Sequence, residues 1–350
     1  MIFFYLFKEK NTNIIKINMS KGLTNIGNTC YMNSALQCLL HLPQLSNENE
    51  SLALDITKRS SKADFGLMKE WLRLYKNMWE DDGIIVLQTR PIFVEFLKRC
   101  QKENIFFESF AQNDAQEFFT LMIDFLHNSI KRKVRIEISG TPKNEYDNTK
   151  IESIKAWKNF FESNYSYIIN QFYSRIISST KCPECDYITK NHEPLSTITL
   201  TLDESYKTIY DSLNEFTKET SLDSENTWTC DKCKESVCPN KRVVFWDLSD
   251  VLIISIKQFR NGRKINHHID FPEHLNMENY CLNIHKERLH YNLSSICIHS
   301  GSLNGGHYYA MCKNYKTGEW NIHNDTNVSS TKIENVLEET PYCLIYVRNE

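Results

Sequence analysis

The sequence predicts an α+β protein in which a helical lobe packs against an antiparallel sheet. From Cys30 to about Asn128 the apolar residues recur mainly at helical spacing. Beyond about Ile168 they form the alternating or short continuous runs that are typical of strands. Helices and strands therefore occupy separate parts of the chain, which favours this class over one in which strands and helices alternate.

The first predicted helix begins at Cys30. Its apolar residues recur at helical spacing as far as Leu40, and Pro43 follows as a stop signal. We expect Asn28 or Thr29 to cap the first turn. Three further helices are predicted at residues 65–79, 91–100 and 115–126.

The chain changes character after the last of these helices. Residues 131–150 are charged and have little periodicity, so we expect an exposed insertion or loop. Asn261-Gly262 is a tight-turn signal between later apolar runs. Strands are predicted at residues 196–202, 251–259 and 293–299, and a hairpin is predicted from two runs, 307–314 and 319–323.

The composition of the 350 residues excludes several classes of function. A formal charge of −3 argues against binding to nucleic acid. The apolar run from Met1 to Phe7 is too short for a membrane span or an ordinary secretory signal. We therefore expect an intracellular protein without a membrane partner, and we assign residues 1–18 to an extension of unknown role. In such a compartment the twelve cysteines indicate metal ligation or catalysis and not disulfides.

Cys30 is a candidate nucleophile because of its place at a helix start. The unpaired N–H groups and the positive dipole end of the helix favour the thiolate, which is the reactive form. The alternative is a small buried cysteine without a chemical role.

A cysteine nucleophile needs a base, and His307 is the candidate. If the hairpin turns between Lys316 and Thr317, paired positions sum to about 633, so His307 faces roughly residue 326. Asn324 and Asp325 lie within one register slip of that position. Either side chain would orient the imidazole in a Cys-His-Asn or Cys-His-Asp arrangement. The alternative is a structural strand histidine.

Two C-x-x-C pairs predict a metal site. Each pair presents two sulfurs from a tight turn, and together they complete a tetrahedral site for Zn²⁺ that is closed and therefore structural. A redox pair or coincidence is the alternative, and Cys238 is a spare thiol nearby. The predicted ligands are Cys182, Cys185, Cys230 and Cys233.

The segment Gln112-Asn113-Asp114-Ala115-Gln116-Glu117-Phe118 reads as the start of a helix. Asn113 or Asp114 would cap it, and acidic residues in its first turn complement the dipole. The segment alone indicates no more than this.

Taken together, these segments resemble the ubiquitin-specific protease family of deubiquitinating cysteine proteases. Residues 22–34, Gly-Leu-Thr-Asn-Ile-Gly-Asn-Thr-Cys-Tyr-Met-Asn-Ser, resemble its cysteine box. Residues 112–118 resemble its Gln-Gln-Asp-Ala-Gln-Glu-Phe segment, with Asn113 replacing the second Gln. Residues 306–310 resemble its histidine box, and residues 320–325 resemble the strand of the third catalytic member. The resemblance runs from about Lys21 to Tyr346, with the boxes in the family's order.

The resemblance implies a papain-like fold with a helical thumb, an antiparallel β palm and zinc-bearing β fingers. It implies one catalytic domain over residues 19–350. Within it we expect the thumb at about 21–130, the insertion at about 131–150, the fingers at about 170–245 and the palm at about 246–348.

The resemblance also implies roles for individual residues. Cys30 would be the nucleophile, His307 the general base and acid, and Asn324 the residue that orients His307, while Asn25 matches the oxyanion-hole residue. Asp325 remains an alternative third member or an aid to the oxyanion region. Substrate contacts are expected from Asp114 and Glu117, which would pair with the basic tail of ubiquitin, and from Tyr308 over a narrow channel.

Two positions depart from the family's pattern. His323 stands where the family often has Phe, and residues 247–250 stand where a proline is common. His323 lies next to Asn324, so it bears on the packing around the expected third member.

The resulting hypothesis is a thiol-dependent deubiquitinase that acts as a monomer on ubiquitin and ubiquitinated proteins. A catalytically inactive ubiquitin-binding module and a protease for a ubiquitin-like modifier remain alternatives. A zinc-ribbon nucleic-acid binder is disfavoured because no Lys/Arg stripe accompanies the cysteine pairs.

Overall fold

Helices and strands are segregated along the chain, as the sequence predicts. The computed structural model describes residues 20–45, 65–260, 262–282, 288–302 and 305–349, and the predicted extension 1–18 lies outside them. The helices are α1 (Cys30–Leu40), the 3-10 turn η1 (Pro43–Leu45), α3 (Gly66–Trp79), α4 (Arg90–Lys102), α5 (Ala115–Ile130), α6 (Glu145–Phe161), α7 (Tyr167–Phe172), α8 (Ile209–Thr217) and α9 (Ile333–Leu337). No helix among the described residues is both long enough and apolar enough to cross a membrane.

The strands follow mainly in the second half of the chain. They are β1 (Gly22–Leu23), β2 (Val86–Leu87), β3 (Ser174–Lys181), β4 (Ile188–Leu195), β5 (Thr197–Thr201), β6 (Thr220–Ser221), β7 (Trp228–Thr229), β8 (Ser236–Val237), β9 (Asn240–Asp247), β10 (Val251–Lys257), β11 (Phe259–Arg260), β12 (Arg263–Lys264), β13 (His274–Asn276), β14 (His290–Ser302), β15 (Gly305–Lys313), β16 (Trp320–Asn324), β17 (Asn327–Thr331) and β18 (Pro341–Arg348).

An eight-stranded sheet forms the centre of the molecule. Its order is β17-β16-β15-β14-β18-β10-β5, and β13 adds to β14. The pairing is antiparallel except between β10 and β5, which run parallel. The α+β class is therefore confirmed, and the expectation of a purely antiparallel sheet is wrong at this one edge.

Strand β10 begins with four consecutive apolar residues because both of its faces are buried. Val251 and Ile253 pack into the core shared with the helical lobe, whereas Leu252 and Ile254 pack into a second core on the opposite face. Because both faces of the strand are covered, no position along its apolar run needs a polar residue.

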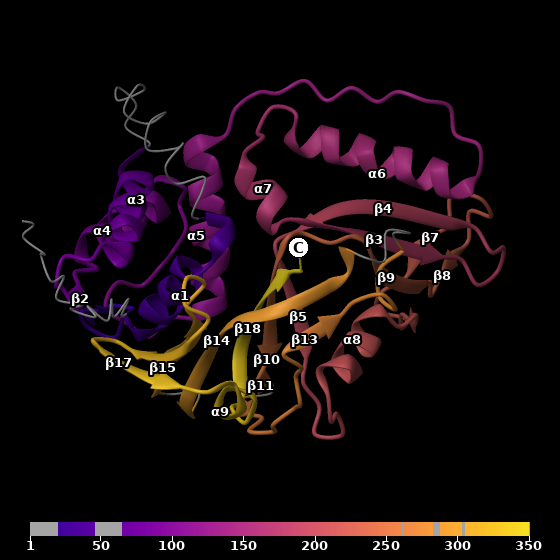
Figure 1. The fold of residues 1–350 in the computed structure, drawn as a ribbon. Helices are drawn as coiled ribbons and strands as arrows, with labels where there is room; N and C mark the ends of the chain where they lie inside the picture. The colour runs from indigo at the N-terminus through magenta and orange to yellow at the C-terminus, as the bar shows by residue number, and fades with distance from the viewer. Residues whose placement is uncertain (1–19, 46–64, 261, 283–287, 303–304, 350) are drawn as a thin grey trace, which may run out of the picture.

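Helix α1 lies at the centre of the helical lobe. It packs against β15, β14 and α5, and all of its residues are buried. Its buried polar side chains are hydrogen-bonded: the Gln37 amide donates to the Lys21 carbonyl at 2.8 Å, and the Ser34 hydroxyl donates to the Cys30 carbonyl at 2.8 Å. The lobe lies beside the sheet, with α3 and α4 on its outer side and α1 and α5 nearer the sheet (Figure 1).

Helix α6 corrects the expectation of a loop over 131–150 at its end, where residues 145–150 are helical, while residues 131–144 form no helix and are mostly exposed. It begins at Glu145, where the side chain of Asn144 accepts a hydrogen bond from the Asp147 N–H at 2.8 Å. The helix lies over β4 (Figure 1). Its helical periodicity is hard to see in the sequence because two of its three buried residues are polar. The three residues are Thr149, Ser153 and Phe161.

The hairpin of β15 and β16 has the predicted register. Ala310 pairs with His323, so paired positions sum to the expected 633. Its turn is closed by the Gly318 N–H, which donates to the Asn314 carbonyl at 2.7 Å, and Gly318 adopts a positive φ of 78°. This register brings the start of β15 and the end of β16 side by side.

Candidate functional site

Three elements bring Cys30, His307 and Asn324 to one place. Helix α1 begins with Cys30, β15 carries His307 near its start, and β16 ends with Asn324. The His307 Nε2 lies 2.7 Å from the Asn324 Oδ1. Because a carbonyl oxygen only accepts, Nε2 carries the proton and Nδ1 is left as the basic atom of the ring. This is the tautomer required to take a proton from a thiol.

Asp325 has a different set of partners. Its carboxylate accepts hydrogen bonds from the Asn25 amide at 2.9 Å and from the Asn33 amide at 2.7 Å. Of the two neighbours that the sequence left open, Asn324 therefore contacts His307, and Asp325 contacts the cysteine box. The role of Asn33 was missed, although the residue lies one helical turn after Cys30.

The loop before α1 is ordered by the side chain of Asn25. Its Oδ1 accepts from the N–H groups of Gly27 at 3.0 Å and Thr29 at 3.2 Å. The expected cap is wrong: the Thr29 hydroxyl turns back and accepts from the Ile26 N–H, and the Asn28 amide donates to the carbonyl of Phe110. The loop conformation therefore depends on Asn25 and not on a helix cap.

The Cys30 thiol is buried, with 3% of its surface exposed. Burial raises the pKa of Cys30, and the nearby Asp325 carboxylate raises it further, while the N–H groups of Tyr308, Tyr31 and Cys30 itself oppose the rise. The N–H groups at the start of α1 thus favour the thiolate as expected, but burial and the Asp325 charge outweigh them. Among the described residues, no hydrogen bond joins Cys30 to His307. Proton removal thus requires His307 to approach the sulfur.

Gln112 links the helical lobe to β15. Its amide donates to the Gly306 carbonyl at 2.8 Å and accepts from the Gly306 N–H at 3.2 Å. These two bonds fix the backbone immediately before His307. This role of Gln112 was not predicted, since nothing local in the sequence indicates a contact 194 residues away.

Asp114 and Glu117 lie on the first turn of α5, next to this link. Asp114 is the cap: its carboxylate accepts from the Gln116 N–H at 2.7 Å and from the Tyr342 hydroxyl at 2.6 Å. Both acidic side chains are exposed. Burial and the neighbouring Asp114 raise the pKa of Glu117. Their contact with a substrate stays a prediction.

Tyr308 is 7% exposed, and its ring packs between two others. Its centroid lies 4.6 Å from that of His299 and 5.4 Å from that of Tyr342. The backbone N–H of Tyr308 is hydrogen-bonded to the Cys30 sulfur. The structure therefore places its backbone at the Cys30 sulfur, and a channel contact by its ring stays a prediction.

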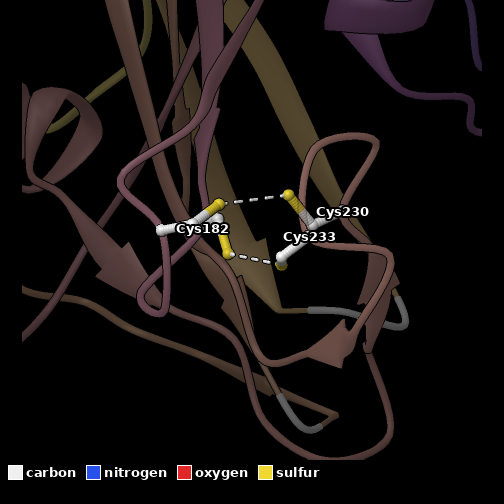
Figure 2. Close-up of side chains that lie close together, drawn as sticks. Cys182, Cys230 and Cys233 are labelled. Carbon is white, nitrogen blue, oxygen red and sulfur yellow. Dashed lines mark hydrogen bonds between the residues drawn. The ribbon is translucent and has the colours of Figure 1, made fainter.

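The four predicted metal ligands lie together, with their sulfurs within 4.8 Å of one another. Figure 2 shows the two loops facing each other with the sulfurs turned inward. The Cys182 and Cys233 sulfurs are 3.8 Å apart, and those of Cys185 and Cys230 are 3.6 Å apart. Four sulfurs around a tetrahedral ion at about 2.3 Å are about 3.8 Å apart. The cluster therefore fits a metal ion, and all four thiols are free of disulfides.

Both loops fold in the same way. In each, the N–H of the first cysteine donates to the carbonyl five residues on, and its carbonyl accepts from the N–H four residues on. The residue at this fourth position has a positive φ, 56° at Asp186 and 64° at Lys234. Desolvation raises the pKa of Cys230, but N–H groups of Cys233 and Lys232 directed at its sulfur outweigh this and bring it to about 7. A backbone N–H lowers the pKa of Cys233, but desolvation and hydrogen bonds to neighbouring sulfurs outweigh it and raise this pKa. Cys230 therefore loses its proton before Cys233, and metal binding would displace the protons that remain.

A family model described as "Ubiquitin carboxyl-terminal hydrolase" matches residues 21–346. This span covers nearly the whole chain and contains every site residue described above.

The chain belongs to the ubiquitin carboxyl-terminal hydrolase family.

Curated relatives agree with this assignment. Ubiquitin carboxyl-terminal hydrolase 2 of Bos taurus is 30% identical over 334 residues, which are 93% of this chain and 54% of the relative. Ubiquitin carboxyl-terminal hydrolase Usp2 of Drosophila melanogaster is 30% identical over 334 residues, 93% of this chain and 34% of the relative. The chain thus spans about half, or less, of the length of these two hydrolases.

Solved structures of the family share the fold. A chain of the SAGA DUB module that contains Ubp8 and is bound to monoubiquitin has a TM-score of 0.72 and 27% identity, over 95% of this chain and 70% of that one. A structure of the yeast SAGA DUB module gives a TM-score of 0.71 and 27% identity, over 95% of this chain and 69% of that one. The fold expected for this hydrolase-family chain, which is papain-like, is therefore confirmed.

The Asp325 carboxylate affects the pH at which the Cys30 thiol of this hydrolase-family chain becomes reactive. A carboxylate disfavours a nearby thiolate, so Asp325→Asn lowers the pKa of Cys30. We expect the pH midpoint for alkylation of Cys30 by iodoacetamide, followed by mass spectrometry of its peptide, to move to lower pH. The control is Asp223→Asn, which removes a carboxylate between β6 and β7. An unchanged or higher midpoint in Asp325→Asn would show that this charge does not act on Cys30.

Proposed function

We propose that this chain is a thiol-dependent deubiquitinase that hydrolyses the isopeptide or peptide bond after the C-terminal glycine of ubiquitin. The observation that carries the proposal is the hydrogen bond from His307 Nε2 to Asn324 on adjacent strands, which leaves Nδ1 as the base beside the helix that begins with Cys30. Membership of the family supports ubiquitin as the substrate. Ubiquitin occupies a solved family structure with the same fold.

The reaction follows from these positions. His307 Nδ1 takes the proton of the Cys30 thiol as the sulfur attacks the glycine carbonyl, and the imidazolium then returns this proton to the leaving amine. A thioester between ubiquitin and Cys30 remains. Water, deprotonated by His307, hydrolyses the thioester and releases the ubiquitin carboxylate and the thiol. Asn324 keeps the imidazole in the required tautomer and stabilises its charged form.

Asn25 is suited to stabilise the oxyanion. Its amide group has two N–H bonds, of which one is held by Asp325. The other is available to the developing negative charge, and the side chain is exposed. Because Asp325 fixes the amide in advance, little reorganisation is needed in the transition state. The Cys30 N–H at the start of α1 would be the second donor.

The acidic face of α5 suits the tail of ubiquitin. Asp114 and Glu117 are exposed one turn apart and lie beside Gln112, which fixes the backbone before His307. We infer that these carboxylates pair with arginines of the basic tail and guide its glycines to Cys30.

The four-cysteine cluster, in our proposal, holds a structural Zn²⁺. The set of four thiolates leaves no position open for a substrate, so the ion would join the β3–β4 and β7–β8 loops and stabilise the fingers. We further propose that the protein acts inside the cell, where these thiols stay reduced, and that it acts as a monomer.

Labelling with a ubiquitin-based electrophilic probe tests the activity. We expect the wild-type protein to form a covalent adduct that is absent in Cys30→Ala, because Cys30 begins the helix beside the strands that carry His307 and Asn324. The matched control is Cys238→Ser, which removes an exposed thiol and leaves labelling intact. Failure of the wild-type protein to label would overturn the proposal, and binding without labelling would indicate an inactive ubiquitin-binding module.

A second experiment tests the finger metal. We expect Cys230→Ser to lower the apparent melting temperature of the zinc-loaded protein by roughly 5 °C or more, because the loops lose the ion that joins them. Cys238→Ser serves as the control, since it removes a neighbouring thiol outside the cluster. Differential scanning calorimetry makes the comparison. Equal melting temperatures for the two variants would contradict a structural metal at this cluster.

A further inference from the structure

A second cluster of potential metal ligands lies inside the molecule, away from the fingers. It consists of His41 at the end of α1, Cys312 on β15 and His323 on β16. One potential ligand atom from each residue lies within 4.8 Å of the others, and all three residues are at most 1% exposed. The two imidazole rings are 4.7 Å apart, centroid to centroid.

The imidazole of His323 lacks the partners that a buried polar group normally has. Neither Nδ1 nor Nε2 has a hydrogen-bond partner among the described residues. Buried polar atoms are nearly always hydrogen-bonded, and those that are not need an explanation such as a bound ion. A phenylalanine, which the resemblance places here in many family members, would fill the same space and leave no buried polar atom without a partner. The histidine therefore points to a ligand.

His41 is arranged as metal-binding histidines usually are. Its Nδ1 lies 2.8 Å from the Gln37 carbonyl oxygen, so Nδ1 carries the proton and Nε2 is the acceptor. The Ser20 hydroxyl donates to Nε2 at 3.2 Å and would have to turn away for Nε2 to bind a metal ion. A ring that donates one N–H to a backbone carbonyl and offers the other nitrogen is the common arrangement of a ligating histidine. Burial lowers the pKa of His41 to about 4 and lowers that of His323 well below its usual value, so both rings are neutral and able to ligate.

A fourth donor lies next to Cys312. The Cys38 thiol is hydrogen-bonded to the Cys312 thiol and comes from the helical turn before His41. Two thiolates and two neutral imidazoles balance the charge of a divalent ion, which favours its burial. Ligand atoms around a tetrahedral zinc ion are about 3.3–3.8 Å apart. The ligand atoms of His41, Cys312 and His323 lie within 4.8 Å of one another and need only a small contraction, whereas the Cys38 sulfur lies outside this group and must move closer to complete the site.

We propose that Cys38, His41, Cys312 and His323 bind a zinc ion in the core. Binding replaces the two thiol protons, which are released to solvent, and no oxidation is involved. The ion would join α1 to β15 and β16, the same three elements that carry Cys30, His307 and Asn324. It would thus hold these three elements together, and its ligand His323 is the immediate neighbour of Asn324 on β16.

Zinc content per chain tests the proposal. The full chain is refolded with excess zinc, freed of loosely bound metal and examined by native mass spectrometry and elemental analysis. We expect two zinc ions in the wild type and one in His323→Phe, which circular dichroism should show to be folded. Cys312→Ser is a second variant expected to retain one ion. The matched control, His274→Phe, replaces an exposed histidine of β13 and should retain two.

A finger variant separates this site from the four-cysteine cluster. In Cys230→Ser/Cys233→Ser we expect one ion to remain, and adding His323→Phe should remove it. A metal count that His323→Phe and Cys312→Ser leave unchanged would overturn the core site, whatever happens at the fingers. Loss of one ion in His323→Phe would support the core site even if the finger cluster held none.

Discussion

The arrangement of the site depends on the carboxylate of Asp325. It accepts one hydrogen bond from Asn25 and one from Asn33, residues that lie 300 and 292 positions away in the chain. The Asp325 carbonyl also accepts from the Leu23 N–H at 2.8 Å. A hydrogen bond to a charged group contributes about 1.5–3 kcal/mol, so the carboxylate is a substantial tie between the cysteine box and the end of β16. Asn25 in turn orders the loop that ends at Cys30.

The backbone around Asp325 is shaped for this contact. Asp325 has a positive φ of 51°, which turns the chain sharply after β16. Gly22 lies against the same turn, and a Cβ there would come within 2.3 Å of the Thr326 carbonyl oxygen. The close approach of two backbones therefore requires glycine at position 22. The tie also has a chemical consequence, because the charge that holds the Asn25 amide raises the pKa of Cys30. In the proposed mechanism this charge disfavours the thiolate, so His307 would have to take the proton from the Cys30 thiol.

The sequence predicted what depends on local patterns. The register of β15 and β16 followed from a short turn, and Asp114 was among the expected helix caps because the cap rules are local. The four-cysteine cluster followed from paired spacing.

Helix α6 was missed because its buried face is narrow and largely polar. The contacts of Gln112 and Asn33 were missed because they cross between distant segments. The cap at Thr29 was wrong because Asn25, four residues earlier, takes its N–H. The histidine at position 323 was visible in the sequence, but its nearness to His41 and Cys312 required the fold.

In the proposed mechanism Asp325 acts by holding Asn25 in place for the oxyanion. A double-mutant cycle measures this directly, with kcat/KM for a fluorogenic ubiquitin substrate determined in the wild type, Asn25→Ala, Asp325→Ala and the double variant. Loss of an oxyanion donor typically costs about 10²–10³-fold. If Asp325 works through Asn25, the loss in the double variant will be far smaller than the product of the two single losses. Two losses that multiply fully would contradict the claim.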